Sequence, residues 1–365
     1  MFRVDASLRI GNGHLMRCLT LAEELRAQGA ECLFICRKHE GNLLDRIEKQ
    51  GYQVRALTGA DNEVFYRSQR AVPAHADWLG TDWGSDAAET LQALSGEVAD
   101  WLVVDHYALN WRWEQALRVA CRSLMVIDDL ADRRHDCDLL LDQNLGRKGE
   151  DYDGLIPAGT VRLIGPSNAL LRREFAGLRE ASLSARQLPQ LKRILVTMGG
   201  VDKDNATGQA LTALSACLLK PELQITVVMG PKAPWLRQIQ EQAEQMNCAT
   251  RVLVDVKDMA QLMAESDLAI GAAGGTAWER CCLALPSIVC VLAENQLQGG
   301  RALQQAGAAI LIQGLKELPA VMGEILRSGH GSAMLRRMSL AAAGVTDGSG
   351  AESVSRRMLA SPRMK

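Results

Sequence analysis

The 365-residue chain is 47% hydrophobic and 23% charged, and its formal net charge is -2. This length exceeds what one ordinary hydrophobic core organises, so two domains are expected. The near-neutral charge excludes a general electrostatic attraction to nucleic acid or to acidic membranes, and any anionic ligand must be held by local features.

The start of the chain predicts no targeting signal. Residues 1–10, MFRVDASLRI, lack the basic flank and apolar run of a signal peptide, and no apolar stretch approaches the roughly 18 residues of a membrane helix. We therefore expect a cytoplasmic protein. The ten cysteines include no CxxC pair and are interpreted as reduced, mostly buried residues.

Apolar runs alternate with segments of helical periodicity along the chain. The runs lie at residues 31–37, 99–105, 123–129, 192–200, 223–230, 267–275 and 286–294. Short apolar runs separated by helices are typical of parallel sheets that are buried on both faces. The predicted fold class is therefore α/β.

The alternation breaks at residues 173–192, a charged helical stretch that ends near a proline. We place a domain boundary near residue 180, which gives an N-terminal domain of residues 1–180 and a C-terminal domain of residues 181–365. Each half opens with a strand and a glycine turn. This repetition favours two Rossmann-like, doubly wound domains facing across a cleft, with ligand at the carboxyl ends of the strands.

The first glycine turn, GNGH at residues 11–14, follows the strand at 2–7 and precedes a helix. Gly11 and Gly13 let the chain turn. His14 then lies at the positive end of the helix, which favours the neutral imidazole that a general base requires. Two alternatives stay open: His14 is only a hydrogen-bonding residue at a helix start, or the turn itself holds phosphate.

Two later stretches of the first half also suggest function. Residues 59–90 form a polar and aromatic insertion, and a loop this long is expected to be functional or mobile. The run at 99–105 continues into Asp105, His106 and Tyr107. Because the last side chains of a strand alternate between its faces, one of these three is expected to face the cleft.

The strongest local signal lies at residues 268–286, LAIGAAGGTAWERCCLALP. Gly274 and Gly275 permit a sharp turn after a strand, and the helix from Thr276 points its free N–H groups and positive dipole outward, as a metal-free diphosphate site requires. Glu279, one turn along, is suited to accept hydrogen bonds from ribose hydroxyls. The alternative is a capping box in which Glu279 bonds to the N–H of Thr276.

Two weaker signals in the second half follow strands. Met198 and Gly199 end one strand and could line the cleft, whereas Asp202 and Asn205 are expected to cap the following helix. The backbone at Val256, after a short strand, could read the edge of a base, although most such strands are scaffold.

The end of the chain holds one more candidate pair. Asn295 and Gln296 follow a strand and could bind sugar hydroxyls, unless they belong to an ordinary polar loop. Residues 347–365 begin with a turn and continue as a basic helix. This segment either crosses back onto the first domain or frays.

A metal site was considered because Asp-x-Asp pairs hold divalent ions in many nucleotide-sugar enzymes. Asp136 with Asp138 lies in a charged turn, and Asp202 with Asp204 lies at a helix start. Neither pair is well placed for a diphosphate held by the turn at 274–276, so no metal is predicted.

Five motifs together resemble a known family, the UDP-2,4-diacetamido-2,4,6-trideoxy-β-L-altropyranose hydrolases of pseudaminic acid biosynthesis. They are, in chain order, GNGHLMRC, VVDHY, IDDLADRRHDCDLLLDQN, TMGG and GAAGGTAWERCCLALP. The resemblance covers most of residues 3–300. It implies the two-domain GT-B fold, which is also found in the N-acetylglucosaminyl transferase of peptidoglycan synthesis.

The resemblance also implies roles for individual residues. It makes His14 the catalytic base, with Asn12, Gly13 and Tyr107 near the substrate. In the second half it implies a diphosphate turn, a ribose contact, a uracil contact and sugar contacts, and the implied substrate-binding residues are Met198, Gly199, Val256, Gly274, Gly275, Thr276, Glu279, Asn295 and Gln296.

The implied reaction is hydrolysis at the anomeric carbon of a UDP-activated 2,4-diacetamido sugar, without cofactor or metal. Water activated by the base would attack opposite UDP, with inversion. Neither nucleic acid nor a membrane is an expected partner, and the oligomeric state is left open. The alternatives are a glycosyltransferase of the same fold, a non-catalytic nucleotide-sugar-binding protein and a UDP-sugar 2-epimerase.

Overall fold

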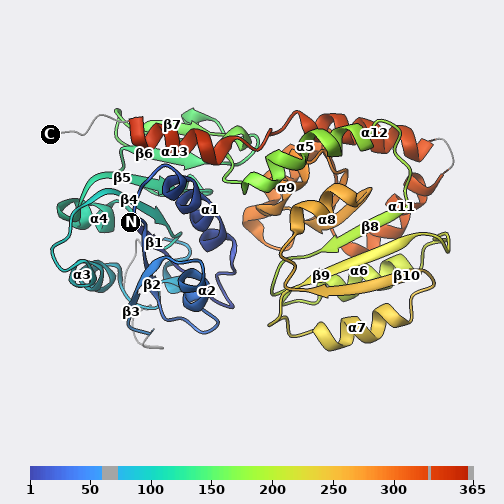
Figure 1. The fold of residues 1–365 in the computed structure, drawn as a ribbon, viewed down its shortest axis with the longest axis horizontal. Coiled ribbons are helices and arrows are strands. Elements are labelled where there is room, and N and C mark those ends of the chain that lie inside the picture. Colours follow the sequence, from blue (N-terminus) through green and yellow to red (C-terminus); the bar gives the residue numbers. More distant parts are fainter. Residues whose placement is uncertain (60–72, 328–329, 361–365) are drawn as a thin grey trace. The chain divides into compact units, whose positions relative to one another are not determined.

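The computed structural model describes residues 1–59, 73–327 and 330–360, apart from the side chain of Asn295. The chain divides into two compact units (Figure 1). Unit 1 comprises residues 1–170 together with the segment from residue 350, and unit 2 comprises residues 171–349. Residues 60–72, which belong to the predicted insertion, lie outside the described residues.

Unit 1 is built on a parallel sheet. Within its described residues the sheet has seven strands in the order β3-β2-β1-β4-β5-β6-β7. The strands are β1 (Phe2–Val4), β2 (Leu33–Arg37), β3 (Gln53–Leu57), β4 (Ala99–Asp105), β5 (Cys121–Ile127), β6 (Leu139–Asp142) and β7 (Val161–Ile164). The helices are α1 (Gly13–Ala27), α2 (Leu44–Lys49), α3 (Trp83–Leu94), α4 (Trp111–Leu117) and α13 (Gly350–Ala360).

The inner strands of unit 1 are buried on both faces, as their apolar runs predict, whereas the edge strands β3 and β7 are partly exposed. Phe34 of β2 belongs to a hydrophobic cluster shared with α1 and α13, whereas its neighbour Ile35 belongs to a second cluster shared with α3 and α4. Successive strand residues point to opposite faces, so a continuous apolar run is needed when helices cover both.

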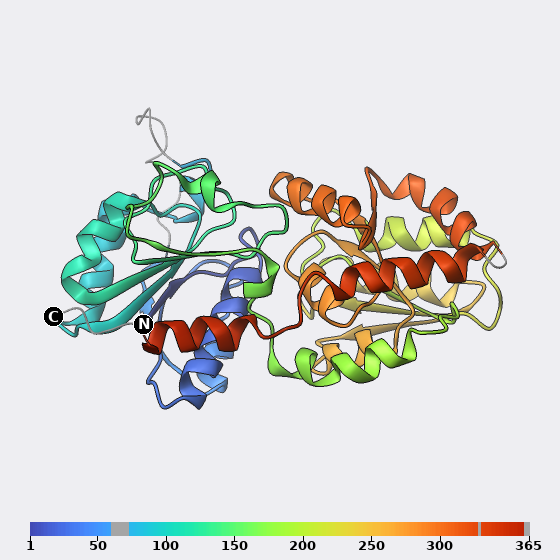
Figure 2. The same cartoon turned by 90° about the horizontal axis from the view of Figure 1, so that it is seen from above.

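The C-terminal helix α13 packs in unit 1, against α1. Figure 2 shows the red α13 crossing the blue α1. Ser355 Oγ accepts a hydrogen bond from Gln28 Nε2 at 2.6 Å, and the Met358 carbonyl accepts one from Trp101 Nε1 at 3.0 Å. The sequence left open whether the C-terminal segment crosses back onto the first domain or frays. In the structure, α13 returns to unit 1.

Unit 2 has a second parallel sheet, with six strands among its described residues in the order β10-β9-β8-β11-β12-β13. The strands are β8 (Arg193–Thr197), β9 (Gln224–Met229), β10 (Ala249–Val254), β11 (Leu268–Ala272), β12 (Ser287–Cys290) and β13 (Ala309–Ile312). The helices are α5 (Arg173–Ala185), α6 (Ala206–Ser215), α7 (Leu236–Glu244), α8 (Met259–Glu265), α9 (Thr276–Cys282), α10 (Leu297–Gln305), α11 (Leu318–Leu326) and α12 (His330–Ala343).

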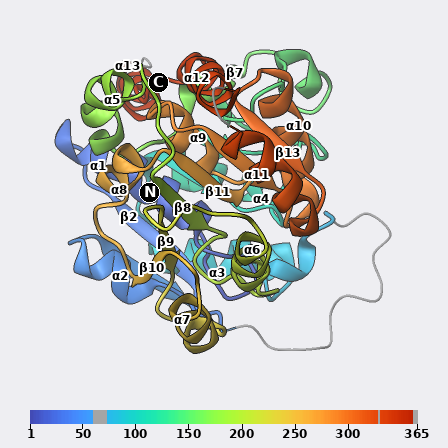
Figure 3. The same ribbon diagram turned by 90° about the vertical axis from the view of Figure 1, so that its right-hand side faces the viewer.

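Helices cover both faces of this sheet as well. Helices α5, α8 and α9 pack together on one face, and α6 packs with α7 and α11 on the other (Figure 3). Both units therefore have the parallel α/β architecture that the alternation of apolar runs predicts. All ten cysteines are free thiols and most are buried.

The division between the units differs from the predicted boundary. Residue 180 falls inside α5, and the whole of this helix belongs to unit 2. Arg179 of α5 donates to the carbonyls of Cys282 and Ala343 at 2.6 and 2.7 Å, and Ser182 donates to the carbonyl of Leu283 at 2.7 Å. The charged composition of α5 resembled a linker, but its polar side chains fasten it to unit 2.

Among the described helices, none is long and apolar enough to cross a bilayer.

Candidate functional site

The glycine turn after β1 places His14 in the first turn of α1. Gly11 adopts a φ of +79°, a conformation that L side chains rarely adopt, and its N–H donates to the Ser7 carbonyl at 2.9 Å. Asn12 is the N-cap residue but makes no side-chain cap bond. Helix α1 then begins at Gly13. A Cβ added to Gly13 would have no other atom within 4 Å.

His14 is paired with a buried carboxylate. Its Nδ1 lies 2.6 Å from Oδ1 of Asp105, the fully buried last residue of β4. Arg17, one turn further along α1, holds both oxygens of the same carboxylate, with Nε and Nη2 each at 2.7 Å. Burial alone would raise the pKa of Asp105, but the Arg17 guanidinium and the His14 ring hold it well below its usual range.

This contact determines which nitrogen of His14 can act as a base. An ionised carboxylate only accepts hydrogen bonds, so Nδ1 of His14 must carry the hydrogen that points at Asp105. In the neutral ring the lone pair is then on Nε2. If Nε2 takes up a proton, Asp105 stabilises the positive charge that results. The pair is arranged as a general base with an orienting carboxylate.

Tyr107 packs against His14 through its ring. The two ring centroids lie 4.5 Å apart with an interplanar angle of 76°. The Tyr107 hydroxyl donates to Asp129 Oδ2 at 2.6 Å, and Arg17 Nη1 donates to the same oxygen at 2.7 Å. Burial and the nearby Asp129 carboxylate raise the pKa of Tyr107 well above its usual value, so the hydroxyl stays protonated.

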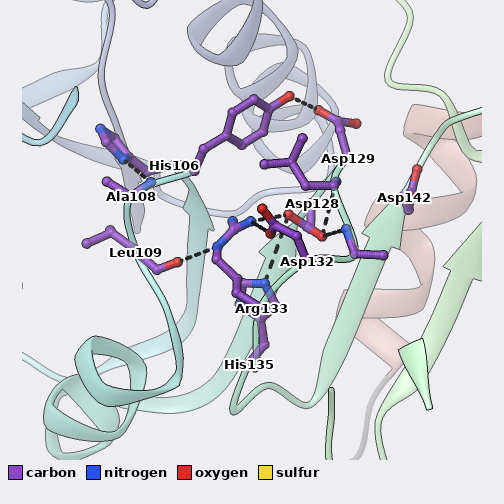
Figure 4. A network of polar contacts seen from close by, with 12 residues as sticks. His106, Ala108, Leu109, Asp128, Asp129, Asp132, Arg133, His135 and Asp142 are labelled. Carbon is purple, nitrogen blue, oxygen red and sulfur yellow. Dashed lines mark hydrogen bonds and ion pairs between the residues drawn. The ribbon is translucent and has the colours of Figure 1, made fainter. Parts of the chain in front are cut away.

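A second polar network holds the carboxyl ends of β5 and β6. Figure 4 shows Arg133 between the Leu109 carbonyl and Asp128. Its Nε donates to the Leu109 carbonyl at 2.8 Å, and its Nη1 lies 2.8 Å from Asp128 Oδ1. The Tyr152 hydroxyl lies 2.9 Å from Asp128 and 2.8 Å from Asp142. The single hydroxyl hydrogen of Tyr152 can be donated to only one of these two carboxylates. Burial raises the pKa of Asp142 to about 6. A proton on Asp142 therefore completes this network at mildly acidic pH.

The residues after β4 divide between two directions. Asp105 and Tyr107 contact His14, whereas His106 lies in another buried network. Its Nε2 is 3.2 Å from Asp5 Oδ2, and its Nδ1 accepts the N–H of Ala108 at 3.1 Å. Alternation along the strand end accounts for this division, and it brings two of the three candidate residues to His14.

Three of the four carboxylates in the two Asp-x-Asp pairs make structural contacts. Arg118 binds Asp136 at 3.2 Å and Asp138 at 2.6 Å. Asp202 accepts two backbone N–H groups at the start of α6, each at 2.8 Å, which confirms its predicted capping role. Within the residues that the structure describes, no group of three or more His, Cys, Asp or Glu side chains is arranged to hold a metal ion.

The glycine turn of unit 2 lies between β11 and α9. Gly274 and Gly275 connect Ala272, the last residue of β11, to Thr276, the first residue of α9. No side chain caps the helix at Gly275. The N–H groups of Ala277 and Trp278 donate to the carbonyls of Gly274 and Gly275 at 2.8 and 3.1 Å. Among the backbone hydrogen bonds of the described residues, none engages the Thr276 N–H, which is left for another acceptor. Gln296 reaches this turn, since a Cβ on Gly274 would lie 3.7 Å from its Nε2. The Asn295 side chain is outside the described part of the structure.

A buried arginine lies beneath the same turn. Arg280 is 1% exposed, and its Nη2 donates to the Ala272 carbonyl at 2.7 Å. The Arg280 side chain has room there because residue 271 is glycine. A Cβ at position 271 would lie 2.6 Å from Arg280 Nη1. Burial lowers the pKa of Arg280 to about 10, which still leaves it charged at neutral pH. The turn therefore has a fixed positive charge behind it.

Glu279 does not form the capping box considered above. Among the hydrogen bonds of the described residues, none joins Glu279 to the Thr276 N–H. Its Oε1 instead lies 3.9 Å from Arg172 Nη2, and its side chain is 18% exposed. Burial raises the pKa of Glu279 to about 6, against the opposing effect of Arg172 and Arg280. The carboxylate is thus free to accept hydrogen bonds from a ligand.

The remaining candidates of unit 2 follow β8 and β10. The Met198 side chain packs in the hydrophobic core, so this residue can offer a ligand only its backbone. Gly199 has a φ of +103°, which favours glycine at that position. Val256 is half-buried and follows Asp255, whose φ is +53°.

Three charged residues at these sites were missed by sequence reasoning. Arg17 lies one helical turn after His14, a spacing that would have indicated a shared face. Asp129 is the second residue of an Asp pair directly after a strand. Arg280 and the adjacent Glu279 are the two charges of the otherwise uncharged segment 276–286, and a charge in such an apolar setting is itself a signal of a specific partner.

Comparison with known proteins supports this architecture. Residues 193–345 match the model of the glycosyltransferase family 28 C-terminal domain. The solved structure of MurG from Acinetobacter baumannii superposes with a TM-score of 0.69 at 15% identity, covering 98% of both chains. The predicted GT-B fold is confirmed. At this identity the likeness to MurG describes the fold alone.

Two curated relatives are also similar in sequence. The UDP-2,4-diacetamido-2,4,6-trideoxy-β-L-altropyranose hydrolase of Campylobacter jejuni is 27% identical over 267 residues, which cover 73% of this chain and 82% of the relative. An uncharacterized protein of Methanocaldococcus jannaschii is 24% identical over 302 residues. That match covers 80% of this chain but spans only 55% of the archaeal protein's length.

Proposed function

We propose that the protein hydrolyses a UDP-activated 2,4-diacetamido-2,4,6-trideoxy hexose to UDP and the free sugar, with His14 as general base. The observation that carries this proposal is the 2.6 Å contact between His14 Nδ1 and Asp105, which leaves Nε2 as the proton acceptor. The similarity to the Campylobacter jejuni hydrolase supports the choice of substrate.

The proposed step is a single displacement. Nε2 of His14 takes a proton from water while the water oxygen bonds to the anomeric carbon and the bond from that carbon to the UDP oxygen breaks. The electron pair leaves with UDP. The turn at residues 274–276, with Arg280 behind it, is proposed to balance the charge that develops on the diphosphate.

The experiment that tests this proposal is incubation of the protein with UDP-2,4-diacetamido-2,4,6-trideoxy-β-L-altrose in water, following UDP release. UDP-N-acetylglucosamine is the matched control substrate. We expect turnover of the first substrate and little of the second. Return of a UDP-linked product from the first would instead identify an epimerase, and binding without UDP formation over hours would identify a non-catalytic nucleotide-sugar-binding protein.

The product is expected to have the inverted anomeric configuration. Direct attack by water inverts the carbon, whereas retention needs a carboxylate nucleophile and a covalent intermediate. Both oxygens of Asp105, the carboxylate in contact with His14, are already held by Arg17. Proton NMR of the first product formed, recorded before the free sugar mutarotates, measures the configuration. An unchanged configuration would eliminate direct displacement.

UDP binding is expected to weaken about tenfold between pH 7 and pH 5. With a pKa of about 6, Glu279 is mostly ionised at pH 7 and only about one-tenth ionised at pH 5, so it loses its capacity to accept ribose hydrogen bonds. Calorimetric titration measures the change. UDP also takes up a proton in this range, so the Glu279→Gln variant is needed to isolate the effect of Glu279. This variant should bind UDP more weakly than wild type at pH 7. Between pH 7 and pH 5 its UDP affinity should fall by a factor about ten times smaller than that of wild type. An unaltered pH dependence would remove Glu279 from the ribose site.

A glycosyltransferase is the second candidate, because unit 2 matches a glycosyltransferase domain model and the fold is that of MurG. In this case an acceptor hydroxyl replaces water and His14 deprotonates the acceptor. UDP release in water alone, at a rate that added sugar or lipid acceptors do not increase, would favour hydrolysis. Release that depends on an acceptor would favour transfer.

A further inference from the structure

A group of aromatic rings surrounds one side of His14. Trp78 stacks on Tyr107 with ring centroids 5.6 Å apart and an interplanar angle of 24°. His75 lies 4.5 Å from the Trp78 ring and 5.4 Å from the Tyr107 ring. The Trp78 ring is 6.4 Å from His14, nearly perpendicular to it. We call His75, Trp78 and Tyr107 the aromatic platform.

The part of the platform that lies within the predicted insertion, residues 59–90, is fastened to unit 1. Trp78 ends a short 3-10 helix, Ala76–Trp78, and the next residue, Leu79, is buried in the hydrophobic core. Asp77 forms an ion pair with Arg9, in the segment that leads to the glycine turn. The side chain of Asp82 then caps α3. These contacts hold the rings in place on the His14 side.

Trp78 and His75 differ from ordinary core aromatics. Both are only half-buried, although they are packed against the buried Tyr107. The polar atom of Tyr107 is turned away to Asp129, so on this side of His14 the Tyr107 and Trp78 rings present mainly apolar surface. A ligand that reaches His14 therefore meets an apolar aromatic surface.

We propose that the aromatic platform packs against the apolar side of the substrate's sugar and selects for sugars that have lost hydroxyl groups. This inference rests on the proposed function. In a 2,4-diacetamido-2,4,6-trideoxy hexose the methyl groups of C6 and of both acetamides are apolar, and among the ring substituents only the C3 oxygen remains a free hydroxyl. Aromatic faces suit such a sugar, whereas hydroxyls at C4 and C6 would lose hydrogen bonds to water there.

The test compares Trp78→Ala and Trp78→Leu with wild type, and uses Trp111→Ala as the matched control. Trp111 is another half-buried tryptophan of unit 1, packed against Arg112 rather than the platform. We expect both Trp78 variants to raise KM for the diacetamido substrate about 10- to 100-fold, with kcat changed less than about threefold, since a contact made equally before and during reaction affects binding alone. The control should match wild type.

A second measurement separates this inference from the proposed hydrolysis. In a His14→Asn background, in which the substrate is expected to survive, UDP-sugar and UDP are titrated with and without Trp78→Ala. We expect Trp78→Ala to weaken UDP-sugar binding by the same 10- to 100-fold and to change UDP binding less than about twofold. Equal UDP-sugar affinity with and without Trp78 would overturn the platform. If wild type releases no UDP, hydrolysis fails, and these titrations still decide the role of Trp78.

Discussion

Replacing His14 with alanine is expected to lower kcat/KM for the UDP-sugar by about 10²- to 10⁴-fold, the usual loss when a general base is removed. Water remains able to reach the substrate, but no other histidine contacts Asp105 in the described part of unit 1. UDP affinity should stay within about threefold of wild type, because UDP is proposed to bind unit 2. Initial rates of UDP release and calorimetric titration of UDP measure the two quantities.

The control for this prediction is His330→Ala. His330 is an exposed histidine that also lies at the start of a helix, α12, so its removal repeats the chemical change outside the proposed site. This variant should retain wild-type turnover. Turnover of His14→Ala within tenfold of wild type would show that His14 is not the base.

Replacing Asp105 with asparagine is expected to lower kcat by at least about 10²-fold, although the side chain keeps its shape. The carboxylate accepts from His14 Nδ1 and from two nitrogens of Arg17, and an amide can replace only one of its oxygens as an acceptor. The His14 ring then loses its fixed tautomer and the charge that stabilises its protonated form.

The stability of this variant is a separate expectation. The pKa of Asp105 is depressed in the folded protein, so its ionised form stabilises the fold above the ordinary pKa of an aspartate, and this contribution is lost only as pH falls through the depressed value. Asp105→Asn removes it at every assay pH, leaving Arg17 with Asp129 alone as its ionic partner. We expect a lower midpoint of thermal unfolding, measured by circular dichroism.

The control is Asp129→Asn, which disturbs Arg17 and Tyr107 but leaves the contact between His14 and Asp105 in place. It should reduce kcat less than about tenfold. If the two asparagine variants lost equal activity, Asp105 would have no specific role in orienting His14.

Local patterns in the sequence determined much of the fold. Continuous apolar runs indicated strands buried on both faces, and Phe34 and Ile35 of β2 do enter opposite clusters. The GNGH motif indicated a glycine turn before a helix, which α1 follows, and Asp202 was expected to be a cap and is one. These features depend on backbone geometry and on neighbours a few residues away, which a sequence displays directly.

Contacts between distant segments were decided only by the tertiary structure. Asp105 lies 91 residues from His14, and three candidate residues followed the same strand, so no spacing rule could select it. The assignment of α5 to unit 2 depends on carbonyls more than 100 residues away, and that of α13 to unit 1 on Gln28 and Trp101.

The sequence by itself therefore determined two parallel α/β units, the glycine turns and the histidine at a helix start, because each follows from local periodicity and backbone freedom. The tertiary structure decided which carboxylate orients His14, which rings surround it and which arginine lies beneath the second turn. These depend on the register of the parallel strands, which brings the carboxyl ends of segments far apart in the chain to one edge of a sheet.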